Sequence, residues 1–314
     1  MVLAIARRNG IEMEGTDDAE RFCAAQRAKR SFRDLQEFLD LYYSSCDANG
    51  VVRAEIFFDP QTHMVERNGL PLAMVVNGLY SACAASPVDA TLIMCFLRHR
   101  HPPLAPADEA EKILDEALAN HKHQIIGVGL DSSEAGHPPR LFERVFAKAR
   151  AAGLRCVAHA GEEGPASYVT EALDLLQIER VDHGVRSLED PMLLARLARD
   201  GIPLTVCPCS NHRLQVNRRF FGGENPTRQL LTKGLKVTLN SDDPAYFFGH
   251  TDKYGKTHGG YVDSCYHATA RECGLTADEC VLLARNSLEA TFAAPEEKAA
   301  LVAKLRAYCE GFSA

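Results

Sequence analysis

The stretch Arg155-Cys156-Val157-Ala158-His159-Ala160-Gly161-Glu162 is a short apolar run that ends in a histidine and a glutamate. Runs that are rich in Val, Ile, Leu and Cys, and polar only near their C-terminal ends, are typical of parallel strands buried on both faces. Further runs of this kind span residues 51–59, 90–98, 125–131, 180–183, 203–208 and 236–241. Together with 155–159 they predict seven parallel strands that carry polar side chains at one end of a sheet.

Helical patterns separate these runs. Residues 140–152 carry apolar side chains at helical spacing and stop at Gly153, and residues 192–199 and 226–233 behave likewise. Strands that alternate with helices indicate an α/β fold, either a barrel or a doubly wound sheet. No Gly-x-Gly-x-x-Gly follows the first run, so a dinucleotide-binding sheet has little support. We therefore expect an α/β fold of the TIM (β/α)8-barrel type.

A TIM barrel has eight strands, one more than the sequence offers. Residues 1–50 are helical in pattern, with an apolar stripe over 35–43, so the missing strand is expected to precede Met1. We expect a single domain over residues 1–314 that is incomplete at its N-terminus. Residues 296–308 are expected to form a C-terminal docking helix with Leu301, Leu305 and Tyr308 on one stripe.

Composition narrows the class of partner. The formal net charge is −7 and the isoelectric point about 6.0, which argues against nucleic acid, because phosphate backbones are bound by clustered Lys and Arg. No apolar run reaches membrane-spanning length, and no signal peptide is recognisable at the start. The eleven cysteines are then expected to be mostly buried thiols in the reducing cytoplasm. The sequence leaves the oligomeric state open.

Three polar stretches fall at the C-terminal ends of predicted strands: His159-Ala160-Gly161-Glu162, Asp182-His183-Gly184 and Ser241-Asp242-Asp243-Pro244. Each alone is a weak signal, since a single histidine at a strand end is usually structural. Active sites of TIM barrels lie at this end of the strands. Three such clusters in barrel order therefore indicate one catalytic rim.

The residue types suit metal-assisted attack of water. Zinc binds imidazole nitrogen and carboxylate oxygen, leaves one position open for water, and lowers the pKa of that water from about 15.7 to about 7. His159 is a candidate ligand, and Glu162 on the same rim is placed to share a proton with the substrate. His183 could hydrogen-bond the attacking hydroxide, Asp242 could complete the metal shell, and Asp243 could turn toward the substrate.

These stretches resemble the adenosine/adenine deaminase family of metal-dependent hydrolases over most of the chain. The resemblance implies a TIM barrel, one Zn²⁺ per chain, and hydrolytic deamination of a small purine. It also implies that His159 and Asp242 are zinc ligands and that Glu162 is the proton shuttle. His183 would orient the hydroxide and Asp243 would contact the purine.

Other stretches resemble the adenine deaminase branch more than adenosine deaminases, namely residues 57–63, 129–134, 136–139, 159–165 and 207–211. Adenine carries an N–H where adenosine carries its ribose. Glu134 could accept that hydrogen bond, although it could equally cap the following turn. The expected reaction is conversion of adenine to hypoxanthine and ammonia in purine salvage. Adenosine or an N6-modified adenine nucleoside or nucleotide is the alternative substrate.

One feature of the family is missing from this sequence. In the family, the first strand ends in a His-x-His pair that supplies two further zinc ligands. Here no histidine precedes His63, and the pair in His121-Lys122-His123 lies in a polar stretch that leads into a strand. We therefore expect residues 1–314 to bind zinc poorly and to turn over little or no substrate. A non-catalytic barrel that binds a purine stays as the alternative.

Two remaining features have competing interpretations. Cys207-Pro208-Cys209 could be a thiolate metal site if strand alternation put both sulfurs on one face, but a structural zinc site needs four ligands. Buried barrel cysteines are the favoured interpretation. Residues 249–260 form a polar loop after the last strand, expected to be either a flap over the site or an exposed insertion.

Overall fold

The computed structural model describes residues 8–9, 36, 46–64, 69–99, 105–244, 246–247 and 249–312. The predicted helix over 35–43 lies outside these residues apart from position 36. The chain divides into two compact units. Unit 1 comprises residues 1–158 and 175–177, and unit 2 comprises residues 159–174 and 178–314.

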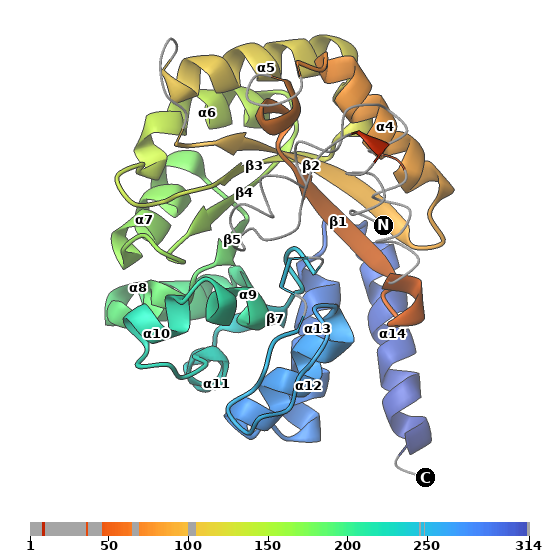
Figure 1. Ribbon diagram of the computed structural model, residues 1–314, viewed down its shortest axis with the longest axis vertical. Coiled ribbons are helices and arrows are strands. Elements are labelled where there is room, and N and C mark those ends of the chain that lie inside the picture. The colour runs from red at the N-terminus through yellow and green to blue at the C-terminus, as the bar shows by residue number, and fades with distance from the viewer. Residues whose placement is uncertain are drawn as a thin grey trace. The chain divides into compact units, whose positions relative to one another are not determined.

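Seven strands are hydrogen-bonded in the order in which they occur along the chain (Figure 1). They are β1 (Arg53–Phe58), β2 (Asp89–Leu97), β3 (Gly127–Asp131), β4 (Arg155–Ala160), β5 (Arg180–His183), β6 (Pro203–Val206) and β7 (Lys236–Leu239). Each lies within two residues of its predicted bounds. The registered pairs are parallel, as Ile93↔Gly127 in unit 1 and Leu204↔Val237 in unit 2 illustrate. The prediction of a parallel sheet is confirmed.

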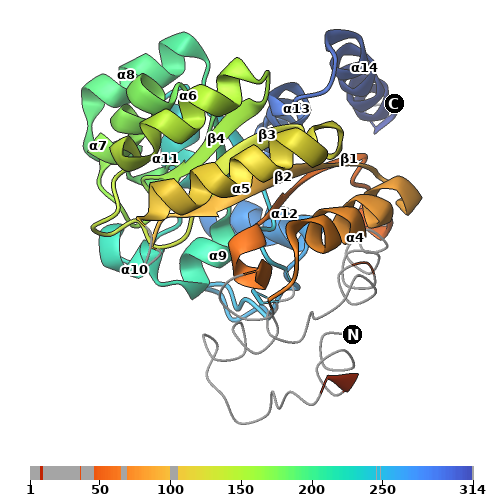
Figure 2. The same ribbon diagram turned by 90° about the horizontal axis from the view of Figure 1, so that it is seen from above.

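In unit 1, three helices cover the strands: α4 (Leu72–Ala85), α5 (Pro106–Asn120) and α6 (Glu143–Ala151). Figures 1 and 2 show α4 and α5 beside β2, and α6 beside β3. The helix predicted over 140–152 begins as a 3-10 turn, Pro139–Phe142, before α6. Short 3-10 turns are common where α-helices begin. Phe146 of α6 packs edge-on against Phe96 of β2, with ring centroids 6.4 Å apart, so this helix closes the core of unit 1.

The described helices of unit 2 follow the remaining strands. They are α7 (Ala166–Glu171), α8 (Pro191–Asp200), α9 (Pro208–Arg213), α10 (Val216–Phe220), α11 (Thr227–Thr232), α12 (Val262–Cys273), α13 (Ala277–Ala290) and α14 (Pro295–Phe312), with a 3-10 turn at Val185–Glu189. The helices predicted over 192–199 and 226–233 are confirmed as α8 and α11. Helix α8 begins where Asp190 accepts hydrogen bonds from the backbone N–H groups of Met192 and Leu193.

The C-terminal helices attach to β7 through α13. The Asn286 side chain donates a 2.9 Å hydrogen bond to the carbonyl of Val237, and α14 in turn contacts α13. Leu301 and Leu305 are half-buried as expected of a docking helix, but Tyr308 is 65% exposed and does not belong to the docked stripe. Among the described residues, no helix is both long and apolar enough to span a bilayer.

The loop over residues 249–260 is braced by one buried carboxylate. Asp252 accepts hydrogen bonds from His258 Nε2 at 2.9 Å, from Arg271 Nε at 2.8 Å, and from the backbone N–H groups of Tyr254 and Lys256. The hydrogen bond from His258 and the guanidinium of Arg271 hold the pKa of Asp252 well below its usual value. The loop is therefore a supported turn around a buried carboxylate, and its role stays open between a flap and an exposed insertion.

This network predicts a specific acid dependence. Because the pKa of Asp252 is lowered in the folded chain, its stabilising effect is present above the ordinary aspartate pKa of about 3.9 and disappears as pH falls below it. Asp252→Asn should lower Tm at neutral pH. The difference in Tm between the variant and the wild type should shrink as the pH falls below about 3.9. Asp263→Asn, at an exposed position of α12, is the matched control. A gap that stays constant with pH would contradict the role of the Asp252 carboxylate.

Candidate functional site

The candidate site lies in unit 2, where strand ends bring the predicted residues together. His159 lies in β4, Glu162 follows that strand, His183 ends β5, and Asp242 follows β7. The His183 ring is the common neighbour. Its Nδ1 lies 3.5 Å from Glu162 Oε1, its Nε2 lies 3.7 Å from Asp242 Oδ2, and its centroid lies 5.1 Å from that of His159. The structure thus brings Glu162, Asp242 and His159 around His183, and their roles stay predictions.

Asn211 holds the buried His183 ring in place. The side-chain oxygen of Asn211 lies 2.8 Å from His183 Nδ1, and a carboxamide oxygen can only accept a hydrogen bond, so Nδ1 carries the proton. Burial opposes a charge on the ring, but the carboxylates of Glu162 and Asp242 outweigh it and raise the pKa of His183. The ring is therefore oriented by Asn211 and electrostatically tuned by two acids.

Gly161 allows the chain to turn between His159 and Glu162. Its φ is +73°, a left-handed conformation, and a Cβ at this position would come within 2.7 Å of Val169 Cγ2. The carbonyl of Gly161 accepts a 2.8 Å hydrogen bond from the backbone N–H of Arg186. A glycine is required here, and the turn leaves Glu162 buried near His183.

Two of the site residues have strained backbones. The φ angles of His183 and Asp242 are 60° and 53°, in the left-handed region that side chains other than glycine rarely occupy. Such a conformation costs of order 1–3 kcal/mol and persists where the surroundings enforce it. The two strained residues face each other, with His183 Nε2 3.7 Å from Asp242 Oδ2, so the strain belongs to the site. Sequence patterns contain no signal for it.

Cys207, for which a buried barrel cysteine was the favoured interpretation, also lies at the site. Its sulfur, a ring nitrogen of His183 and a carboxylate oxygen of Asp242 all lie within 4.8 Å of one another. Burial, and then the carboxylates of Asp242 and Glu162, raise the pKa of the thiol well above its usual value. Cys207 therefore stays protonated unless a cation joins it.

The expectation that Cys207 and Cys209 share one strand face is wrong. Strand β6 ends at Val206 and α9 begins at Pro208, because proline suits the first turn of a helix. Cys209 is therefore helical, and its sulfur lies 3.5 Å from that of Cys265. Both cysteines of the motif are buried as predicted.

Asp243 and Asp182 flank the cluster in sequence. Asp243 is exposed, and its carbonyl accepts hydrogen bonds from the N–H groups of Tyr246 and Phe247. Its contact with a substrate stays a prediction. Asp182 is buried and accepts a 2.7 Å hydrogen bond from the hydroxyl of Thr205, and burial raises its pKa. Its carboxyl group is thus occupied by the neighbouring strand β6.

Glu134 belongs to unit 1. It is buried after β3, and its backbone carbonyl accepts a 2.9 Å hydrogen bond from the N–H of His137, so this residue does close a turn. A substrate contact by its carboxylate stays a prediction. Unit 1 also brings ligand atoms of Asp59, Cys95 and Asp131 within 4.8 Å of one another.

The His121-Lys122-His123 stretch is structural, as expected. His121 ends α5, its Nδ1 lies 2.7 Å from Gln124 Oε1, and residues Lys122–Gln124 form a 3-10 turn that leads into β3. It therefore lies at the opposite end of β3 from Asp131, away from the strand ends that carry the polar clusters.

Comparison with known proteins assigns this arrangement to a family. The sequence profile described as adenosine deaminase matches residues 44–308, which span both units. The chain belongs to the adenosine deaminase family. A relative named adenine deaminase from Paraburkholderia phytofirmans is 46% identical, over 98% of this chain and 88% of its own length.

Solved structures agree with the family. The crystal structure of an adenine deaminase from Arthrobacter aurescens is 37% identical, with a TM-score of 0.86 over 98% of this chain and 94% of that one. An amidohydrolase from Burkholderia ambifaria, solved with bound Zn, is 27% identical, with a TM-score of 0.83 over 99% of this chain and 86% of that one. The predicted α/β fold of the TIM-barrel type is thereby confirmed.

The role of Asn211 can be tested directly. Asn211→Leu removes the acceptor of the His183 Nδ1 proton and should destabilise the fold by about 1–3 kcal/mol, because a buried donor loses its partner. The ring-nitrogen NMR signals of His183 should shift at the same time. Asn217→Leu makes the same change at another buried asparagine and should leave those signals in place. Unmoved His183 signals in Asn211→Leu would remove Asn211 from this role.

Proposed function

We propose that this chain is a zinc-dependent hydrolase that converts adenine and water to hypoxanthine and ammonia. The observation that carries the proposal is the buried His183 ring, set 3.5 Å from the Glu162 carboxylate and 3.7 Å from that of Asp242, with His159 beside it. An acid, a histidine and potential metal ligands within one cluster are the groups that hydrolytic deamination requires.

The donor set fits a zinc ion. We propose that His159 and Asp242 hold one Zn²⁺ per chain, since imidazole nitrogen and carboxylate oxygen are the ligands zinc accepts. The sulfur of Cys207 lies within 4.8 Å of the Asp242 carboxylate, so the surroundings offer a third donor of the types zinc prefers. When bound, the metal would acidify a water molecule and lower its pKa from about 15.7 to about 7.

The chain's own residues would then move protons and orient the reactants. Glu162 would take a proton from the water and deliver it to the purine ring nitrogen beside the carbon that carries the amino group. His183, fixed by Asn211, would hydrogen-bond the attacking oxygen. A new carbon–oxygen bond forms, the second proton of the water passes to the amino group, and the carbon–nitrogen bond breaks so that the amino group leaves as ammonia. Asp243, exposed next to Asp242, would bind the purine.

Adenine is the proposed substrate, because relatives of 41–46% identity over nearly the whole chain are named adenine deaminase. Glu134 is proposed to accept the N–H that adenine has and adenosine lacks. We further propose that residues 1–314 act as one deaminase domain in cytoplasmic purine salvage, since the family profile spans both units.

Substrate preference tests the branch of the family. Purified residues 1–314, assayed with excess zinc because the sequence contains no His-x-His pair before His63, should release ammonia from adenine with a higher kcat/KM than from adenosine. Adenosine 5′-monophosphate and its N6-methyl form complete the series. A preference for either nucleotide would overturn the adenine assignment, and tight adenine binding without ammonia release would favour a purine-binding protein instead.

Glu162 is the residue whose removal should affect turnover most selectively. Glu162→Gln keeps the shape of the side chain but cannot shuttle a proton, so kcat should fall by about 10²–10⁴-fold while zinc content, measured by elemental analysis, stays at the wild-type level. Glu163→Gln is the matched control, because the Glu163 side chain pairs with Arg219 at 3.1 Å. Equal activities of the two variants would remove Glu162 from the mechanism.

A further inference from the structure

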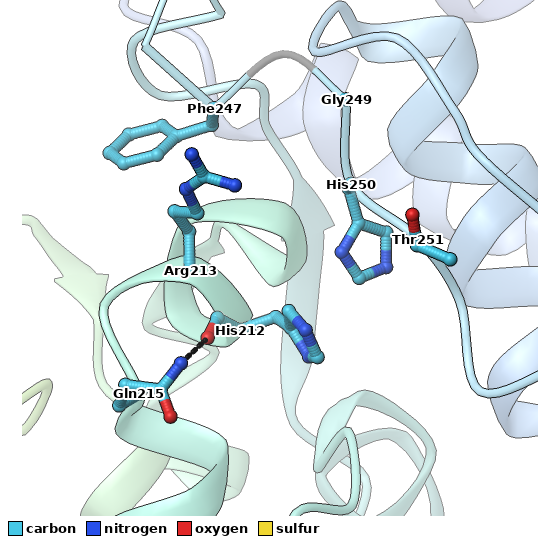
Figure 3. Close-up of a pocket in the computed structure, with 7 residues that line it drawn as sticks. All are labelled: His212, Arg213, Gln215, Phe247, Gly249, His250 and Thr251. Carbon is cyan, nitrogen blue, oxygen red and sulfur yellow. Dashed lines mark hydrogen bonds between the residues drawn. The ribbon is translucent and has the colours of Figure 1, made fainter. Parts of the chain in front are cut away.

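A pocket of about 220 Å³ lies in unit 2, lined by residues that the proposed deamination does not use. One wall comes from α9 and the turn after it, with His212, Arg213 and Gln215. The other wall comes from Phe247 and from His250 and Thr251 of the braced loop. Figure 3 shows the side chains of His212 and Arg213 on one side and the ring of His250 on the other. Pockets for drug-sized ligands run from about 300 to 1,000 Å³, so this one suits a smaller ligand.

His250 is the buried polar group of the pocket. It is 5% exposed, and its Nε2 lies 3.0 Å from Glu272 Oε1. Its Nδ1 is buried and has no hydrogen-bond partner among the residues that the structure describes. Figure 3 shows one ring nitrogen of His250 directed toward the wall that carries Arg213 and His212. A buried donor or acceptor without a partner is costly, so this nitrogen points to a missing ligand.

The charge on His250 decides what that ligand is. Burial opposes protonation, but the hydrogen bond from the ring to Glu272 and the charges of Cys209, Glu272 and Asp252 outweigh it and raise the pKa of His250. Glu272 is itself fixed by a 3.1 Å hydrogen bond from Asn225. A protonated ring that uses Nε2 to donate to Glu272 has one N–H left, at Nδ1. That group can only donate, and it requires an acceptor.

The opposite wall adds donors of the same kind. Arg213 lines the pocket, is exposed, and carries a permanent positive charge. The Gln215 amide nitrogen uses one of its two N–H groups to reach the His212 carbonyl at 3.3 Å. Burial and the neighbouring His250 lower the pKa of His212, which therefore presents a neutral imidazole.

We propose that this pocket binds a small oxyanion of the phosphate class, between the Arg213 guanidinium and the Nδ1–H of His250. Arg is suited to phosphate because its planar fork of donors matches the oxygens. The shared chemistry is a phosphate group, either free or carried as a monoester on a small molecule.

A divalent cation is the competing occupant, and the structure favours the anion. A carboxylate behind a histidine is also the arrangement of many metal-binding histidines. However, Arg213 would repel a cation at close range. Among the described residues, neither group of three potential metal ligands includes His212 or His250.

Isothermal titration calorimetry of the full chain with inorganic phosphate, at constant ionic strength in chloride buffer, tests the site. Arg213→Gln and His250→Asn should each weaken phosphate binding about tenfold or more, since each removes a charge-assisted hydrogen bond. Arg218→Gln makes the same change at an exposed position of α10 outside the pocket and should bind like the wild type. Circular dichroism checks that each variant is folded. If His250→Asn does not fold, Arg213→Gln alone tests the site.

Further titrations separate the sources and the competitor. Ribose 5-phosphate binding more tightly than inorganic phosphate would identify a monoester as the ligand, and equal affinities would identify the free oxyanion. Each of these results supports the site. Unchanged phosphate affinity in Arg213→Gln, or an equal loss in Arg218→Gln, would overturn it. The proposal would also be overturned if the wild-type protein bound no phosphate but bound cobalt(II), and if His250→Asn abolished that cobalt(II) binding.

Discussion

The burial of an imidazole between two carboxylates is the constraint on which the candidate site depends. His183 is almost fully buried, so its ring has to be hydrogen-bonded, and the Asn211 oxygen at 2.8 Å meets that need. The carboxylates of Glu162 and Asp242 then raise its pKa against the effect of burial. Moving any one of these groups leaves a buried charge or a buried N–H without compensation. Each group of the cluster therefore depends on the others for its stability.

The backbone around this cluster adopts unusual conformations that hold the side chains in place. Both His183 and Asp242 adopt left-handed φ angles, and Gly161 and Gly184 do so beside them. A Cβ at Gly184 would lie 2.5 Å from Leu204 Cδ2, so the turn after β5 admits only glycine. Strain of this kind is retained where the surrounding packing fixes the geometry, and here the packing is that of the strands β5 and β6.

Much of this organisation can be predicted from the sequence, for a physical reason. Strands buried on both faces have to be apolar throughout, so their positions appear as short runs of Val, Ile, Leu and Cys that turn polar where they end. His159, Glu162, His183 and Asp242 were found because they occupy those ends. The same rule wrongly places Cys207-Pro208-Cys209 on one strand, because the alternation of side chains gives no sign that a helix begins at Pro208.

What the sequence could not predict depends on contacts between distant segments. Asn211 faces His183 across 28 residues of chain, and Glu272 of α12 meets His250 from 22 residues away. Left-handed φ angles at His183 and Asp242 likewise follow from packing and not from residue type. The braced loop was recognisable as a loop, but its buried carboxylate, Asp252, was not.

The proposed chemistry requires a metal held where the strands β4 and β7 end, and anomalous diffraction at the zinc edge tests this directly. Crystals of the full chain grown with zinc and hypoxanthine should show one strong peak in unit 2. It should lie about 2.0–2.2 Å from a ring nitrogen of His159 and from a carboxylate oxygen of Asp242. A peak bound to His183 and Cys207 without His159, or no peak beside Asp242 at saturating zinc, would contradict the assignment.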